Sequence, residues 1–246
     1  MTLFGNNFTK ATIKIREAVL NLFFPKRCIE CQSYGSFLCD SCLGKLKVPA
    51  NSECHNCRLS SQNGKLCDQC AGKSFLDFLW IMGDYDDQII KDIICKIKYE
   101  YIEELSYALD KLIKDFFVEV QYFKNSLFVP VPLHRRRLLE RGFNQAQLIS
   151  ERVSQIIGGV IDVNLLVRIK YNAPQAKLSA KERRANLAGF FKINTERSEF
   201  YDKKRPIILV DDVYTTGTTM QECAKLLKNE GFESVGGIVI ARGKWG

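Results

Sequence analysis

The sequence contains no run of about 20 apolar residues, which is the length that a membrane-spanning helix needs. The nearest approach, residues 18–24, is interrupted by Asn21 and is not followed by the small residues of a signal-peptide cleavage site. Proline and glycine are also scarce, at 6 and 16 of 246 residues, which excludes a low-complexity scaffold. We therefore expect a cytoplasmic protein without an integral membrane segment.

A large excess of charge is absent as well. Hydrophobic residues make up 46% and charged residues 26% of the chain, so there is enough apolar material for a core and enough charge for solubility. This balance excludes a disordered acidic or basic tail. A length of 246 residues is typical of one or two domains, because single domains run to about 100–200 residues.

Cysteine, by contrast, is abundant and unevenly placed. Two cysteines separated by two residues can present both sulfurs to one ion, and two such pairs complete a tetrahedral Zn²⁺ site. Four disulfides are disfavoured because no export signal is present, and a redox centre would need only one pair. Four pairs therefore predict two structural zinc ions. The eight cysteines are Cys28, Cys31, Cys39, Cys42, Cys54, Cys57, Cys67 and Cys70.

The sequence leaves open which C-x2-C pairs share an ion. Sequential pairing closes short loops of seven and nine residues and is the simplest arrangement, whereas interleaved pairing is the alternative. His55 lies within a pair, but eight cysteines already fill both sites, so we expect no ligand role for it. Each four-thiolate site carries a net charge of −2, which lowers the formal charge from +8 to about +4. That balance permits a nucleic-acid partner without requiring one.

Composition divides the chain into three parts. Residues 1–27 contain an amphipathic helix over about residues 12–24, which Pro25 ends. Residues 28–74 form a double zinc-ribbon module and its polar linker, with few large apolar residues because zinc replaces a core. Residues 75–246 alternate strand-like and helix-like segments, as α/β domains do.

The third part predicts a mostly parallel sheet with helices on both faces. We expect strands over residues 76–85, 127–131, 161–169, 206–210 and 234–241. Helices are expected over residues 89–97, 102–116, 143–157, 181–187 and 218–231.

One segment of this domain, residues 207–219, is typical of a ligand site. Four apolar residues predict a buried parallel strand, and open α/β sheets bind ligands at the carboxyl ends of such strands. Asp211 and Asp212 stand at that end, before a loop of threonines around Gly217 and the start of a helix. Small hydroxyl residues and a helix N-terminus form a phosphate cradle, while carboxylates can accept hydrogen bonds from sugar hydroxyls. The ligand chemistry predicted is that of a sugar phosphate.

This segment looks like the phosphoribosyl pyrophosphate (PRPP) signature of type I phosphoribosyltransferases. The resemblance implies that Asp211 and Asp212 contact the ribose hydroxyls and that the following loop binds the 5′-phosphate. The loop residues so implied are Thr215, Thr216, Gly217, Thr218 and Thr219. Hypoxanthine-type purine-salvage relatives have an acidic residue in place of Thr215, which disfavours that activity here.

Further motifs narrow the resemblance. Residues 129–137, 141–145, 174–175 and 183–186 resemble the ComF family of competence proteins and their GntX-like relatives. That family couples an N-terminal zinc module to a phosphoribosyltransferase-like α/β domain, and the similarity extends from about Pro25 to Arg242. It implies PRPP and Mg²⁺ as ligands, a role in DNA uptake during natural transformation, and single-stranded DNA and the DNA-uptake machinery as partners.

Basic segments carry a second set of candidate contacts. Arginine pairs with phosphate oxygens bidentately, so arginines near the site can hold either pyrophosphate or a nucleic-acid backbone. A solvated surface is the alternative explanation. The candidates are Arg135, Arg136, Arg137 and Arg141, together with Lys98 and Tyr99, which resemble a Lys-Tyr element of the family.

Three functions are compatible with these features. The first is a PRPP-binding, phosphoribosyltransferase-like protein that handles incoming single-stranded DNA. The second is a non-catalytic zinc and DNA-binding adaptor, with PRPP as a regulator or absent. The third is a metabolic phosphoribosyltransferase that transfers the sugar from PRPP and releases pyrophosphate. Fold analogy alone cannot choose among them, and the sequence assigns no catalytic residue.

Overall fold

The structure is a computed structural model that describes residues 25–49, 53–100, 104–117, 125–171 and 189–243. Its contacts divide the chain into two compact units, residues 1–45 and residues 46–246. The module boundaries expected at 27/28 and 74/75 follow composition rather than packing and stay predictions. The helix expected over residues 12–24 lies outside the described residues. Among the helices that the structure describes, none is both long and apolar enough to span a bilayer.

The first unit is held by a small set of backbone contacts around a cysteine knuckle. Arg27 and Tyr34 form an isolated antiparallel bridge, and the Cys28 N–H donates to the Ser33 carbonyl at 2.8 Å. A single helical turn, α2 (Asp40–Leu43), follows. We refer to residues 28–42 as the first ribbon.

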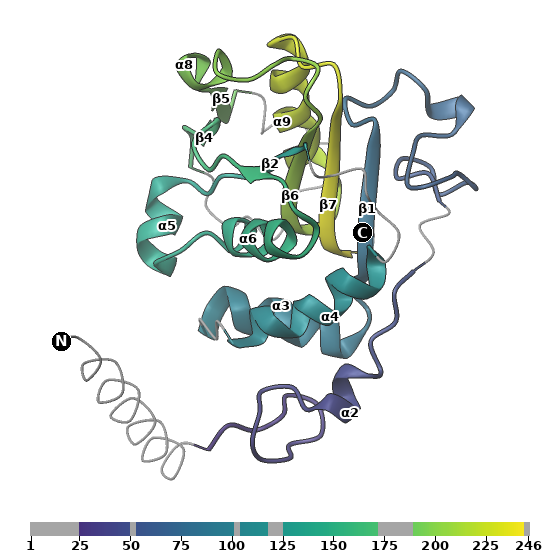
Figure 1. Ribbon diagram of the computed structural model, residues 1–246, viewed down its shortest axis with the longest axis vertical. Helices are drawn as coiled ribbons and strands as arrows, with labels where there is room; N and C mark the ends of the chain where they lie inside the picture. Colours follow the sequence, from purple (N-terminus) through teal and green to yellow (C-terminus); the bar gives the residue numbers. More distant parts are fainter. Residues whose placement is uncertain (1–24, 50–52, 101–103, 118–124, 172–188, 244–246) are drawn as a thin grey trace, which may run out of the picture. The chain divides into compact units, whose positions relative to one another are not determined.

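The second unit contains a five-stranded sheet whose strand pairs are all parallel, which confirms the predicted α/β class. The strand order is β1-β7-β6-β2-β3 (Figure 1). The strands are β1 (Phe78–Asp84), β2 (Leu127–Pro130), β3 (Val160–Ile161), β6 (Ile207–Tyr214) and β7 (Val235–Arg242). A separate two-stranded antiparallel sheet joins β4 (Leu166–Arg168) and β5 (Phe191–Ile193).

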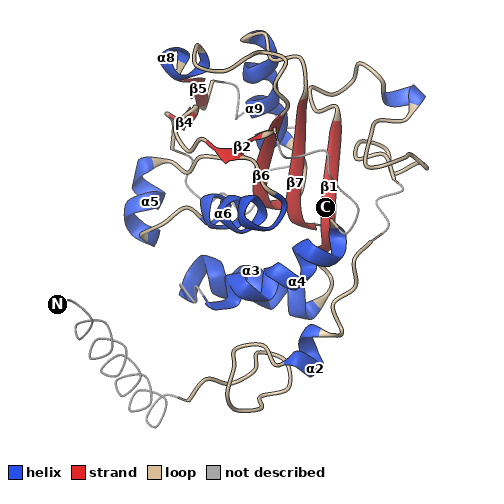
Figure 2. Cartoon of the chain, in the orientation of Figure 1, coloured by secondary structure: helices blue, strands red, loops and turns tan. Residues whose placement is uncertain are grey.

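Helices pack on both faces of the sheet (Figure 2). Side chains alternate between faces along a strand, so Ile207 and Leu209 of β6 share one apolar cluster with Cys223 of α9. On the other face, α6 packs against β2 and β6, and α4 packs against α3 and α6. The helices are α3 (Gln88–Glu100), α4 (Glu104–Phe116), α5 (Arg135–Arg141), α6 (Gln145–Ile157), α8 (Thr195–Ser198) and α9 (Thr218–Asn229).

Three predicted elements were wrong in detail. The strand expected over 161–169 is two strands, β3 and β4, in different sheets, because the Asp162 carboxylate accepts the Asn164 N–H at 2.8 Å and turns the chain. The strand expected over 206–210 continues to Tyr214, since it keeps pairing with β7. Residues 135–141, read only as a basic segment, form α5. The helix expected over 181–187 lies outside the described residues.

The remaining cysteine-rich segment, residues 53–70, packs on the sheet of the second unit, and we call it the second ribbon. β1 lies at the edge of the sheet, and Lys65 forms an antiparallel bridge with Phe78 on that edge. The Leu79 N–H donates to the Gly64 carbonyl at 3.0 Å, and Trp80 Nε1 donates to the Asn63 carbonyl at 3.0 Å. The second ribbon therefore extends the sheet beyond its edge strand.

Candidate ligand site and metal centres

The eight paired cysteines form two groups of four, each with its sulfur atoms within 4.8 Å of one another. Cys28, Cys31, Cys39 and Cys42 make one group, and Cys54, Cys57, Cys67 and Cys70 make the other. This is the sequential pairing.

The sulfur positions fit a tetrahedral zinc ion. A Zn–S bond of about 2.3 Å implies sulfur atoms about 3.8 Å apart. Cys31 Sγ lies 3.6 Å from Cys39 Sγ, and Cys57 Sγ lies 3.4 Å from Cys67 Sγ. These cysteines can therefore hold two structural zinc ions, which would fix each ribbon in place of an apolar core.

His55 is buried beside the second cysteine group and binds other partners. Its Nδ1 lies 3.2 Å from the Gly64 carbonyl, and its Nε2 lies 3.2 Å from Ser74 Oγ. Because a carbonyl can only accept, Nδ1 carries the proton in this contact. The histidine joins the second ribbon to the segment that follows it.

The candidate ligand site lies where β6 runs into α9. Because β6 continues through residues 211–214, Asp211 and Asp212 lie within the strand and their side chains point to opposite faces. Asp211 lies on the face of α9, where its charge raises the pKa of Cys223. Asp212 lies on the face of α3, where Lys98 Nζ is 2.8 Å from its Oδ2.

Asp212 is only 6% exposed, and Lys98 is its ion-pair partner. Within the part of the chain that the structure describes, no donor meets Asp212 Oδ2 in hydrogen-bond alignment. Lys98 Nζ, 2.8 Å away, compensates the charge of this oxygen, although the contact is not aligned as a hydrogen bond. This oxygen is able to accept a hydrogen bond from a ligand hydroxyl.

Asp211 has an unusual proton affinity. Burial, together with the neighbouring charge of Asp212, raises the pKa of Asp211 to about 7, although Lys98 and Arg168 oppose the shift. Its Oδ1 accepts the Asp212 N–H at 2.9 Å. The carboxyl therefore changes its charge near neutral pH.

Arg168, at the end of β4, is a residue that the sequence analysis missed. Its charge lowers the pKa of Asp211, and burial together with the charge of Arg137 lowers its own pKa. The sequence offered only one indication of its role, a positive charge near the end of a predicted strand. The expected single strand over 161–169 hid it, because the turn at Asp162 separates β3 from β4.

The loop of residues 215–219, called here the phosphate loop, has the geometry of an anion cradle. Gly217 has φ +73°, and a Cβ there would lie 2.2 Å from the Tyr214 hydroxyl, so no other residue fits. Gly217 caps α9 without a side chain, and the first-turn N–H groups of α9 point towards the loop. Thr216 Oγ1 and Thr218 Oγ1 lie 2.9 Å apart and share a hydrogen bond.

The predicted basic residues fall into two groups. Lys98 contacts Asp212, and Arg137 lies close enough to Arg168 to lower its pKa. The other group is the exposed surface of α5, a helix with no buried residue. There Arg136 stacks over the Tyr171 ring at 4.8 Å and Arg141 over the Tyr99 ring at 5.5 Å.

Two family models match this chain. Residues 140–245 match the phosphoribosyl transferase domain. Residues 19–71 match the double zinc ribbon domain. The first match contains β6, the phosphate loop and α9, and the second contains all eight paired cysteines.

Curated relatives match most of the chain. Competence protein F of Haemophilus influenzae is 29% identical over 82% of this chain and 96% of its own length. The DNA utilization protein YhgH of Escherichia coli K12 is 30% identical over 74% of this chain and 80% of its own length. Competence protein ComFC of Bacillus subtilis is 28% identical over 79% of each chain.

We expect protein purified without added metal to contain about two zinc ions per chain, because each cysteine group supplies four thiolates. Elemental analysis against protein concentration measures the ratio. Cys28→Ser should lower it to about one and leave the melting of the second unit unchanged, since the first ribbon belongs to the other unit. Cys95→Ser, outside both groups, is the control and should keep a ratio of two. A ratio near one in the unmodified protein would mean that one group holds no metal.

We also expect Asp211→Asn to stabilise the protein in a pH-dependent way. With its pKa raised to about 7, Asp211 holds a proton in the folded state that the unfolded chain releases near pH 4. Stability of the unmodified protein therefore falls between about pH 4 and pH 7 and is level above that. The Asp211→Asn variant escapes this loss, so its gain in melting temperature should grow across the same window to about 5 °C or more.

Thermal denaturation at pH 4 to 8 measures this gain. The exposed Asp115, paired with Lys111 on α4, provides the control variant Asp115→Asn. A gain for Asp211→Asn that is equal at all pH values would contradict the raised pKa.

Proposed function

Because the chain belongs to the ComF family, in which a double zinc ribbon precedes a phosphoribosyltransferase domain, we propose that it binds PRPP and handles incoming single-stranded DNA. The PRPP site is the carboxyl end of β6 together with the phosphate loop. The DNA contacts are the exposed arginines of α5.

One observation supports the PRPP assignment most strongly. Carboxylates that can accept hydrogen bonds from sugar hydroxyls lie next to a loop that can bind a phosphate group. Asp212 Oδ2 is buried without an aligned donor in the described residues, and it suits a ribose hydroxyl. The family resemblance assigns the other hydroxyl to Asp211, whose side chain leaves β6 on the opposite face, towards Arg168. The 5′-phosphate would accept hydrogen bonds from N–H and O–H groups of the phosphate loop, residues Thr215, Thr216, Gly217, Thr218 and Thr219.

Cations near the strand end suit the pyrophosphate group. Lys98 lies beside Asp212, and Arg168 lies near Asp211. The carboxylates and threonine hydroxyls are hard oxygen donors, which fit Mg²⁺ bound through a phosphate ligand. When bound with PRPP, Mg²⁺ would neutralise charge on the pyrophosphate leaving group.

Two forms of the proposal differ in their chemistry. In the enzymatic form, an acceptor nucleophile forms a bond to the anomeric carbon of PRPP as the bond to pyrophosphate breaks, as it also would in a metabolic phosphoribosyltransferase. In the binding form, PRPP regulates a DNA-handling adaptor and pyrophosphate is not released. Release of pyrophosphate from PRPP, with and without DNA, distinguishes the two forms.

The names of the relatives and the surface of α5 support the DNA part. The relatives are called competence proteins and DNA utilization proteins. On α5, Arg136 and Arg141 stack on Tyr171 and Tyr99, so cations for the phosphate backbone lie beside aromatic rings that can stack on bases. This combination is typical of surfaces that bind single strands without sequence preference.

We expect calorimetry to detect PRPP binding in the presence of Mg²⁺ and to detect none in the double variant Asp211→Ala with Asp212→Ala, because both ribose contacts are removed. Removing Asp211 relieves the repulsion between the two carboxylates, whereas removing Asp212 leaves Lys98 without its ion-pair partner, so a melting curve of the variant is needed to show that it is folded. Asp115→Ala, on the exposed surface of α4, is the control and should bind PRPP normally. An unaltered PRPP affinity in the double variant would contradict the assignment of Asp211 and Asp212 as ribose contacts.

For DNA, we expect binding that ignores base sequence and weakens steeply with salt. The slope of log K against log salt is roughly −0.7 per phosphate on single strands, so about four contacts give a slope near −3. Replacing Arg135, Arg136 and Arg137 by alanine should flatten the slope by about two units and leave PRPP affinity unchanged.

A charge-matched control separates specific contacts from net charge. Replacing Lys91, Lys111 and Lys225 by alanine removes the same number of charges from α3, α4 and α9. It should change the slope much less than the arginine variant does. Loss of PRPP binding with retained DNA binding in the arginine variant would reassign α5 to pyrophosphate, and loss of neither would make it a solvated surface.

A further inference from the structure

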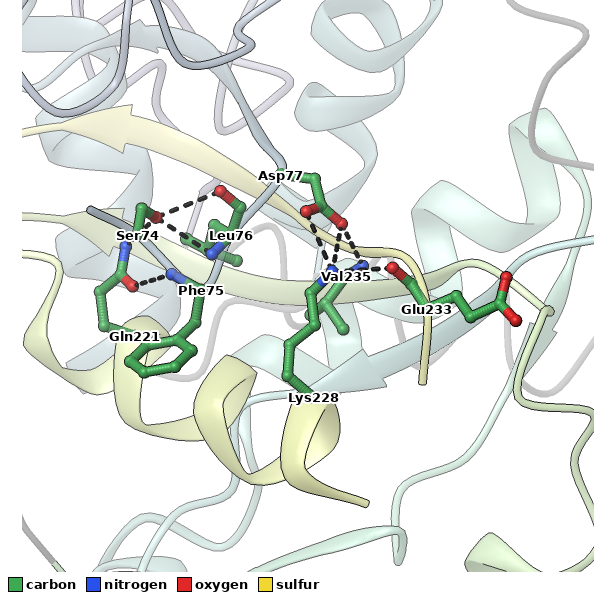
Figure 3. Close-up of polar contacts among 8 residues, drawn as sticks. All are labelled: Ser74, Phe75, Leu76, Asp77, Gln221, Lys228, Glu233 and Val235. Atoms are coloured by element: carbon green, nitrogen blue, oxygen red, sulfur yellow. Dashed lines mark hydrogen bonds and ion pairs between the residues drawn. The ribbon is translucent and has the colours of Figure 1, made fainter. Parts of the chain in front are cut away.

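The linker between the second ribbon and β1, residues 71–77, is tied to α9 at two places (Figure 3). In the first turn of α9, Gln221 Nε2 donates to Ser74 Oγ at 2.7 Å, and the Phe75 N–H donates to Gln221 Oε1 at 2.9 Å. Near the end of α9, Lys228 Nζ contacts both oxygens of Asp77, at 2.8 and 3.0 Å. The same linker therefore contacts the start of the helix and its end.

The contact at the start of α9 reaches both the second ribbon and the phosphate loop. Ser74 Oγ, which binds Gln221, also lies 3.2 Å from Nε2 of His55 in the ribbon. The backbone N–H of Gln221 donates to the Gly217 carbonyl at 2.9 Å. A short chain of hydrogen bonds thus runs from the ribbon, through Ser74 and Gln221, to the phosphate loop.

Arg242, at the end of β7, makes a second connection between the same two places. Its side chain is only 10% exposed, and its Nη2 donates to the His55 carbonyl at 2.8 Å. Its guanidinium lies 5.9 Å from the ring centroid of Tyr214, its register partner on β6. The Tyr214 hydroxyl in turn lies against Gly217. Two routes, both starting at His55, therefore join the second ribbon to Gly217 of the loop.

We propose that Ser74, Gln221 and Arg242 are positioning residues through which the second ribbon, when it holds its metal, sets the conformation of the phosphate loop. The second ribbon and the loop belong to the same compact unit. The part of this inference that concerns PRPP rests on the proposed function. The part that concerns the loop itself does not.

The coupling has a thermodynamic consequence that works in both directions. If metal in the second ribbon orders the loop, then a ligand held by the loop must also favour metal retention in that ribbon, by the same factor. PRPP should therefore raise the zinc affinity of the second ribbon.

The first test measures hydrogen exchange of the amides of residues 215–221 without any ligand. Gln221→Met removes the amide contact to Ser74 but keeps helix propensity, and it should speed exchange in the loop by about fivefold or more, as the loss of one or two hydrogen bonds predicts. Ser74→Ala should act in the same direction. Neither variant touches a zinc ligand, so folding of the ribbon is preserved.

Lys228→Met is the matched control. It removes contacts of the same linker with the same helix, but at the end remote from the loop (Figure 3). It should leave exchange at residues 215–221 unchanged. Equal exchange in all three variants and the unmodified protein would overturn the coupling, and so would an equal acceleration by Lys228→Met.

The second test measures zinc affinity by equilibrium competition with a chromogenic chelator, with and without saturating PRPP and Mg²⁺. In Cys31→Ser, which retains only the second site complete, PRPP should raise the zinc affinity several-fold, and Gln221→Met added to it should reduce that gain. If calorimetry shows that PRPP binds but the zinc affinity is unaffected, the coupling is wrong. If PRPP does not bind the unmodified protein, the proposed function is wrong, and the exchange experiment still decides the coupling.

Discussion

Asp211 and Asp212 occupy consecutive positions of a strand that is buried in the sheet, so two carboxylates must share one end of the core. The strand separates them onto opposite faces, and each face supplies a cation, Lys98 from α3 and Arg168 from β4. Neither carboxylate is fully compensated. Asp211 holds its proton up to about pH 7, and Asp212 keeps an oxygen that no described donor meets in alignment. Polar groups left in this state are commonly found at sites built for a ligand.

Much of this arrangement follows from local sequence. The C-x2-C spacing predicts both cysteine groups, and the apolar strand with its threonine loop predicts where β6 meets α9, because these features depend on residues close together in the chain. Arg168 could not be found in this way. Its place beside Asp211 requires the break after β3, where Asp162 turns the chain by accepting the Asn164 N–H and is itself held by Arg197 and Tyr201, residues more than 30 positions away.

The two ribbons differ in structure in a way that their cysteine patterns do not predict. Both have two C-x2-C pairs and the same alternation of buried and exposed cysteines, so sequence alone treats them as equivalent. The second pairs with the edge of the sheet in its own compact unit, through Gly64 and Lys65. That difference depends on backbone hydrogen bonds to β1, which any residue can make, and composition therefore carries no signal for it.

The position of the second ribbon also bears on the order in which the chain is made. β1 pairs on one side with the ribbon that precedes it and on the other with β7, about 150 residues later. At a synthesis rate of roughly 5–20 residues per second, β1 is made about 8 to 30 seconds before β7. Throughout that interval the only backbone partner in place for β1 among the described residues is the ribbon. The second ribbon then keeps β1 extended through backbone pairing until β7 has been made.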